Sequence, residues 1–199
     1  MPYTEISFLD NVLCKMKAPI TDGCVLVQES QNTQAEQLCK VTIDGLSNDY
    51  ICLKTDKAKI QIFSKGYGNK QCDYIILNEN NGQKVALFLE MKSTNVDNAD
   101  ARNQSPLKNS DDEYADYVLQ LRSSSCLFDY LDSVLSAFCQ CNKLGQDYKR
   151  HFAVLHTKDI PTVQTGILPI RPVPNISPET AYIKKVVNDA HISFHSLII

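Results

Sequence analysis

The stretch that decides the fold is residues 71–93, which read QCDYIILNENNGQKVALFLEMKS. Two apolar runs rich in β-forming residues flank an Asn-Gly pair at residues 81–82, a pair suited to the positive-φ positions of a hairpin turn. An antiparallel hairpin about this turn brings Asp73 beside Glu90. Glu90 and Lys92 are two residues apart on one strand, so they project from the same face. The stretch therefore predicts two carboxylates and a lysine at one end of a buried hairpin.

This group of side chains suits a hard divalent cation. Mg²⁺ prefers oxygen ligands in octahedral geometry and retains several waters. The carboxylates of Asp73 and Glu90, with the backbone carbonyl of Met91, provide such ligands, and Mn²⁺ could replace Mg²⁺. Lys92 could orient or help to deprotonate an attacking water and offset phosphate charge. The structural alternative, which the spacing leaves open, is a charged strand end where Lys92 only neutralises two carboxylates.

The order of these residues resembles the motif of the PD-(D/E)xK nuclease superfamily. Cys72-Asp73 precedes one apolar strand, and Glu90-Met91-Lys92 closes the next. Cys72 stands where the name of the motif has proline, a position that varies in that superfamily. The resemblance covers mainly residues 50–125. It implies an α/β fold of the restriction-endonuclease-like type, in which helices flank a central mixed β-sheet, and Asp73, Glu90 and Lys92 as the catalytic residues.

A helical region follows the hairpin. Apolar residues recur at helical spacing over residues 114–121 and again over residues 127–138, and three serines at 123–125 predict a break or a kink between them. The resemblance implies that the first helix packs beside the site. It makes Gln120 a candidate for supporting the catalytic group and Arg122 a candidate phosphate contact. The alternative for both is an ordinary surface polar residue.

The most basic segment lies before the hairpin. Residues 54–70 carry five lysines and one aspartate, a balance of 5 − 1 = +4. Such a segment could follow the phosphates of a nucleic acid beside the metal. An equally open alternative is a solvated edge strand protected by lysines. The candidate nucleic-acid contacts in this segment are Lys57, Lys59, Lys65 and Lys70.

The rest of the chain predicts a single domain, residues 1–199, in three parts: an N-terminal helical segment (1–38), a core with the hairpin (39–160) and a C-terminal extension (161–199). The pattern predicts a hairpin between residues 50–53 and 60–63, a long polar loop over residues 93–112 and a strand over residues 151–156. It also predicts a helix from Cys24 toward Leu38. In the extension we expect a helix from Ser177 to about Asp189 and a strand over residues 192–199.

Composition limits the compartment and the partners. The chain has 199 residues, 43% hydrophobic and 22% charged, with a net charge of −3, so any nucleic-acid binding must come from a local basic patch. No apolar run is long enough to span a membrane, and the N-terminus does not resemble a secretory signal. The eight cysteines lie mostly in apolar runs without metal-site spacing, which favours reduced thiols in a cytoplasmic protein.

The sequence and the resemblance together predict a Mg²⁺-dependent endonuclease that hydrolyses phosphodiester bonds. The resemblance favours DNA over RNA and fits a role in prokaryotic defence against foreign DNA. A homodimer or a regulatory protein partner stays open. The alternative from another class is a non-catalytic domain of the same fold that binds nucleic acid or protein. The presence of Asp73, Glu90 and Lys92 together argues against this alternative, because a decayed site would tend to lose one of them.

Overall fold

The structure is a computed structural model. It describes residue 18 and residues 20–21, 23–28, 40–55, 71–80, 82–92, 116–139, 147–156 and 174–199. Several predicted features lie outside these residues: the first part of the N-terminal segment, the partner strand at 60–63, the loop at 93–112, and four candidate nucleic-acid contacts, Lys57, Lys59, Lys65 and Lys70.

The larger sheet contains the predicted hairpin at its centre. Its five strands lie in the order β4-β5-β6-β7-β8: β4 (Asp49–Lys54), β5 (Tyr74–Asn80), β6 (Gln83–Lys92), β7 (Lys149–His156) and β8 (Tyr182–Lys185). Asn80 pairs with Gln83 across the turn, and Gly82 has a φ of 76°, which glycine adopts without strain. The predicted hairpin, with Gly82 at a positive φ in its turn, is therefore confirmed, while Asn81 lies outside the described residues. β6, β7 and β8 run parallel, whereas β5 is antiparallel to β4 and β6.

A smaller sheet packs against one face of the larger one. Its strand order is β1-β2-β3-β9, with β1 (Ile20–Thr21), β2 (Cys24–Gln28), β3 (Lys40–Asp44) and β9 (Ala190–Ser193). β3 and β9 are parallel although they come from opposite ends of the chain. Val25, Val27, Val41 and Ile43 are fully buried and form one core with the facing residues of β5, β6 and β7.

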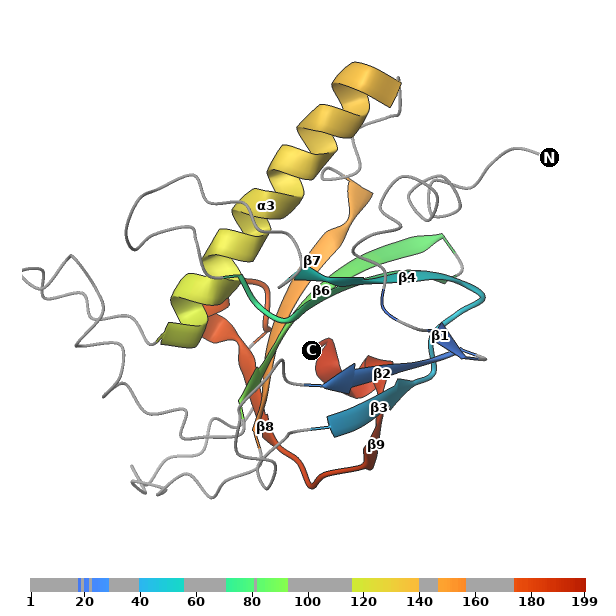
Figure 1. Cartoon of the computed structure of the whole chain (residues 1–199), viewed down its shortest axis with the longest axis vertical. Helices are drawn as coiled ribbons and strands as arrows, with labels where there is room; N and C mark the ends of the chain where they lie inside the picture. The colour runs from blue at the N-terminus through green and yellow to red at the C-terminus, as the bar shows by residue number, and fades with distance from the viewer. Residues whose placement is uncertain are drawn as a thin grey trace, which may run out of the picture.

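Helix α3 (Asp116–Cys139) covers the opposite face of the larger sheet. Leu121, Phe128 and Leu135 recur on one side of this helix and pack on Phe88 and Phe152, whose rings stack with centroids 4.9 Å apart. The described part of the molecule is thus a helix, a five-stranded sheet and a four-stranded sheet in three layers (Figure 1). The structure confirms an α/β chain with a central mixed sheet, and among the described residues one α-helix flanks it.

Of the break or kink expected at residues 123–125, a break is wrong, because α3 is one continuous helix of 24 residues. Serines are poor helix formers in isolation, since their hydroxyls compete for backbone groups. Here tertiary contacts engage two of them. The Ser124 hydroxyl accepts the Cys72 amide hydrogen at 2.7 Å, and the Ser125 hydroxyl accepts from the Arg150 guanidinium at 2.7 Å.

Three further predictions are corrected at the ends of the chain. Cys24–Gln28 is a strand, because it pairs with β3, so the helix expected from Cys24 does not start there. Ser177 does form the predicted cap, but only for the short 3-10 helix η2 (Pro178–Thr180); the residues that follow form β8. Residues 190–193 form β9 and are followed by the 3-10 helix η3 (Phe194–Leu197), in place of a terminal strand over 192–199. The C-terminal residues thus contribute a strand to each sheet.

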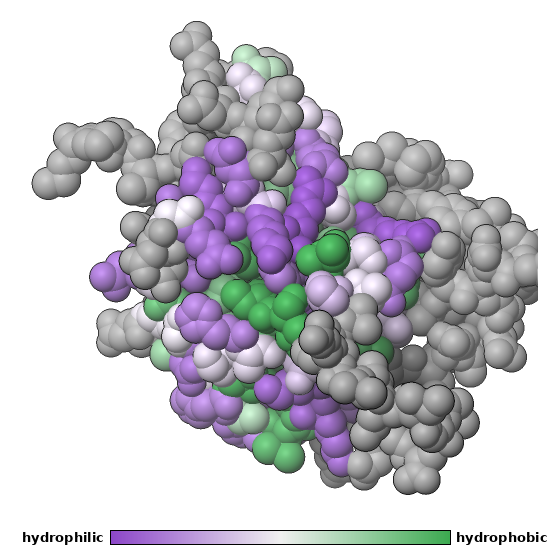
Figure 2. All heavy atoms as spheres, turned by 180° about the vertical axis from the view of Figure 1, so that it is seen from behind, coloured by the Kyte–Doolittle hydropathy of each residue, from purple (hydrophilic) through white to green (hydrophobic). Residues whose placement is uncertain are grey.

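The surface seen from behind the view of Figure 1 is mainly hydrophilic, with hydrophobic residues gathered near its centre (Figure 2). Five large hydrophobic side chains of the described residues are exposed: Leu26, Tyr130, Ile176, Ile183 and Val187. Within the described residues, no helix is both long and apolar enough to cross a membrane. The four cysteines whose side chains are described are free thiols: Cys24, Cys52, Cys72 and Cys126.

Candidate active site

The larger sheet places Glu90 and Lys92 on its helix-facing side. On β6, Leu87, Leu89 and Met91 pack toward the smaller sheet, while Phe88 packs toward α3. Strand alternation therefore turns Glu90 and Lys92 toward α3. Asp73 lies one residue before β5, and its position follows from its contact: its Oδ2 accepts the Met91 amide hydrogen at 2.8 Å. The pairing of Tyr74 with Leu89, extended by one residue, sets Asp73 opposite Glu90.

Lys92 is the centre of the contacts at this site. Its Nζ lies 2.6 Å from Glu90 Oε1 and donates a hydrogen bond of 2.8 Å to Gln120 Oε1. Glu90 is only 2% exposed, so its carboxylate is held in a poorly solvated place beside the ammonium group. The structure thus brings Gln120, from the first turns of α3, onto the predicted catalytic lysine, as the resemblance implied. Gln120 Nε2 also donates to the Gln71 carbonyl at 3.5 Å.

Asp73 is positioned by the strand end next to it. Its Oδ2 accepts the Met91 amide hydrogen at 2.8 Å, which ties the carboxylate to the residue between Glu90 and Lys92. Its backbone carbonyl accepts from the Thr55 amide at 3.0 Å. The Met91 side chain is buried on the other face, and the role of its carbonyl as a metal ligand stays a prediction.

Cys72, the residue before Asp73, is fixed by hydrogen bonds of its backbone. The Cys72 amide donates to Ser124 Oγ at 2.7 Å, a bond that proline could not make. Its carbonyl accepts from the Thr55 hydroxyl. Burial raises the pKa of the Cys72 thiol, so this thiol is a packing group and not a nucleophile. Sequence reasoning missed Ser124 and Thr55, because nothing in their spacing indicates which distant backbone groups they meet.

Arg122 is engaged elsewhere. Its Nη2 lies 2.6 Å from Glu179 Oε1, and its Nε donates to the same oxygen, which joins α3 to η2. Burial opposes the charge of Glu179, but hydrogen bonds from its own backbone, Ser177 and Arg122 outweigh it and hold the pKa of this carboxyl below its usual range. The structure therefore places Arg122 in a bond between two elements of the fold, so a phosphate would have to compete with Glu179 for it.

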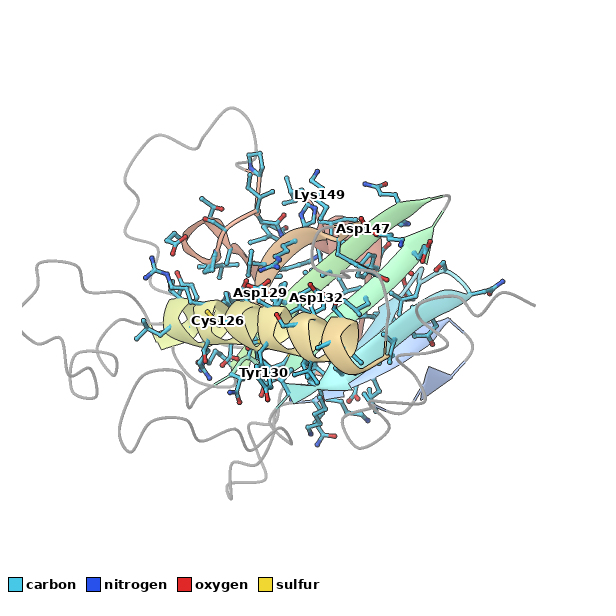
Figure 3. All side chains as sticks on the ribbon, turned by 90° about the horizontal axis from the view of Figure 1, so that it is seen from above. Cys126, Asp129, Tyr130, Asp132, Asp147 and Lys149 are labelled. Atoms are coloured by element: carbon cyan, nitrogen blue, oxygen red, sulfur yellow. The ribbon has the colours of Figure 1, made fainter. Side chains whose placement is uncertain are left out.

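A second contact fixes α3 on the sheet at some distance from the site. Arg150 of β7 donates to Asp129 Oδ2 at 3.2 Å and lies over the Phe128 ring, with the guanidinium carbon 5.5 Å from the centroid. Viewed from above, Asp129 and Asp132 lie on the side of α3 nearest the start of β7, while Tyr130 lies on its other side (Figure 3). Together with the bond between Arg122 and Glu179, these contacts hold the helix that carries Gln120.

The donors at the site suit Mg²⁺ in chemistry. Asp73 and Glu90 are oxygen ligands at one end of the hairpin, and Mg²⁺ is commonly held by one or two carboxylates plus waters and substrate oxygens. Among the described residues, no three His, Cys, Asp or Glu side chains come together as a metal-binding group. A comparison of the chain with protein-family models, with curated proteins and with solved structures found no match in any of the three.

Proposed function

We propose that this chain is a Mg²⁺-dependent nuclease with a restriction-endonuclease-like fold. One observation carries the proposal: Lys92 Nζ lies 2.6 Å from Glu90 Oε1 and donates to Gln120, and the Met91 amide between Glu90 and Lys92 donates to Asp73 Oδ2. The order of the motif in the sequence predicts that these residues act together, and the contacts support the proposal. The three-layer arrangement of sheet and helix supports the proposal at the level of fold class.

Each residue has a role that its contacts support. Asp73 and Glu90 would hold the cation, and a bound Mg²⁺ supplies Lewis-acid polarisation of the phosphate and neutralises its charge. Lys92 is held as a cationic donor between Glu90 and Gln120, and it would orient the attacking water and face the developing negative charge. In the hydrolysis, the water oxygen bonds to phosphorus and the P–O bond to the leaving sugar oxygen breaks. The leaving oxygen takes up a proton, so the products are a phosphate end and a hydroxyl end.

The test is a cleavage assay in Mg²⁺ and in Mn²⁺ against plasmid DNA, single-stranded DNA and RNA. Glu90→Gln and Lys92→Met should each lower the cleavage rate by about 10²-fold or more, since each removes a group proposed to act at the reacting phosphate. The structure offers matched controls on the same two strands. Glu79 and Lys84 pair across the far end of the hairpin, so Glu79→Gln and Lys84→Met make the same changes of charge away from the site.

A second readout does not depend on turnover. Mg²⁺ that binds the folded protein raises its melting temperature, and Glu90→Gln should remove most of that rise while Glu79→Gln keeps it. Cleavage by Glu90→Gln at the rate of the parent would refute the assignment of the site. A parent that binds nucleic acid without cutting it would favour the alternative, a non-catalytic binding domain.

A further inference from the structure

The end of the sheet that carries Lys92 continues across two more strands, β7 and β8. Lys92 pairs with His156 of β7, and His156 pairs in turn with Lys185 of β8. Because β6, β7 and β8 are parallel, all three residues lie at the same end of the sheet. The helix that the sequence predicts from Ser177 to about Asp189 would not align Lys185 with the site, whereas the observed strand does.

All three side chains belong to the helix-facing side. On β7, Phe152 and Val154 pack toward α3 and Ala153 and Leu155 pack away from it, so alternation gives His156 the same side as Lys92. On β8, Tyr182 packs toward the smaller sheet. Lys185, three residues later, therefore faces the opposite way, toward the side of α3.

The neighbouring lysine on β8 provides the contrast. Lys184 belongs to the side of the smaller sheet, where its Nζ donates to Ser196 Oγ at 3.3 Å. Lys185 is exposed, and its backbone is fixed on β7 by the pairing with His156 and by the next bond, from the Val186 amide to the His156 carbonyl at 2.8 Å. The fold thus holds an exposed cation at a set distance from Lys92.

We propose that Lys185, with the buried His156 between it and Lys92, extends the site and binds a phosphate next to the one that is cut. This inference rests on the proposed nuclease function. Adjacent strands are about 4.8 Å apart, so β6 and β8 are separated by roughly 10 Å. Successive phosphates of one strand of duplex DNA advance by about 3.4 Å along the axis. The distance from Lys92 across His156 to Lys185 is therefore long enough for Lys185 to face a phosphate next to the one that is cut. Its partner is therefore the sugar–phosphate backbone of a nucleic acid, contacted without reading its bases.

The experiment measures binding of a fluorescent DNA duplex, and of its single strand, by anisotropy in Ca²⁺ over a range of salt concentrations. Lys185→Gln should weaken duplex binding and reduce the magnitude of the salt slope by about 0.9, the value for one lost phosphate contact. Lys185→Arg should bind like the parent, because the charge remains. Lys184→Gln, which changes the same charge on the other side of β8, should also bind like the parent.

Cleavage kinetics in Mg²⁺ separate this inference from the proposed function. Lys185→Gln is expected to raise KM while kcat stays near the parent value, since Lys185 is not placed at the reacting phosphate. If the parent cleaves but Lys185→Gln and Lys184→Gln bind DNA equally well, the extended site is wrong and the nuclease proposal stands. If the parent neither binds nor cleaves DNA or RNA, both proposals are overturned. If it acts on RNA alone, the DNA contact of Lys185 is wrong and the nuclease proposal stands.

Discussion

Replacing Lys92 by methionine should destabilise the protein strongly, whatever its activity. Glu90 is 2% exposed and its Oε1 lies 2.6 Å from Lys92 Nζ, so the substitution leaves a buried carboxylate without the cation beside it. Removing one partner of a buried ion pair lowers the free energy of unfolding by about 3–5 kcal/mol. The Lys92 side chain is 18% exposed, which gives water some access and favours the lower end, about 3 kcal/mol. Methionine keeps most of the apolar stem, so lost packing adds little.

Urea unfolding in EDTA, followed by far-ultraviolet circular dichroism, measures this effect. With a slope of about 1–3 kcal/mol per molar urea, a loss of about 3 kcal/mol lowers the midpoint by about 1–3 M. The double variant Glu90→Gln/Lys92→Met should recover most of the loss, because the remaining amide carries no charge. Lys84→Met is the control. Its ion pair with Asp147 spans 3.6 Å and Asp147 is 51% exposed, so its loss should cost less than about 1 kcal/mol.

A Lys92→Met midpoint that matches the Lys84→Met midpoint would refute the reasoning. It would mean that Glu90 and Lys92 do not form a buried ion pair in solution. The proposed active site, which depends on that pair, would then be wrong as well. If Lys92→Met is destabilised and the double variant is no better, the loss comes from packing or from the bond to Gln120, and not from the stranded charge.

Three other predictions concern the rest of the fold. Asn175→Ala should lower the free energy of unfolding, measured with urea, by about 3 kcal/mol. The reason is that the buried Asn175 side chain forms hydrogen bonds with the His151 ring and with three backbone groups. A decrease of less than about 1 kcal/mol would contradict this prediction. Burial lowers the pKa of His151, so the unfolded chain takes up this proton more readily, and the free energy of unfolding should fall as the pH drops below about 6.5. His151→Gln should remove that part of the pH dependence, and an unchanged pH dependence would contradict this. In the native protein the exposed Cys126 should react with an aromatic disulfide reagent well before Cys72, whose pKa burial raises; equal rates would count against the described core.

Local sequence is enough to predict the hairpin and the gathering of its charged ends. The Asn-Gly turn sets the register of the two strands. Side chains along each strand alternate between the two faces, which decides which residues share a face. The sequence alone therefore predicts that Asp73, Glu90 and Lys92 lie together. The strand over residues 151–156 is predictable from local sequence too, because a continuous apolar run indicates a strand buried on both faces.

Tertiary structure decided the features that depend on distant partners. α3 continues through its serines because Cys72 and Arg150 engage their hydroxyls, and no local propensity contains that information. Tyr182–Lys185 is a strand because β7 offers an open edge, although its capped start at Ser177 also fits a helix. A residue's own neighbours set its preference by at most about 1 kcal/mol, whereas pairing with a sheet edge satisfies a whole row of backbone groups. That is why the position of Lys185 beside the site could not be read from the sequence.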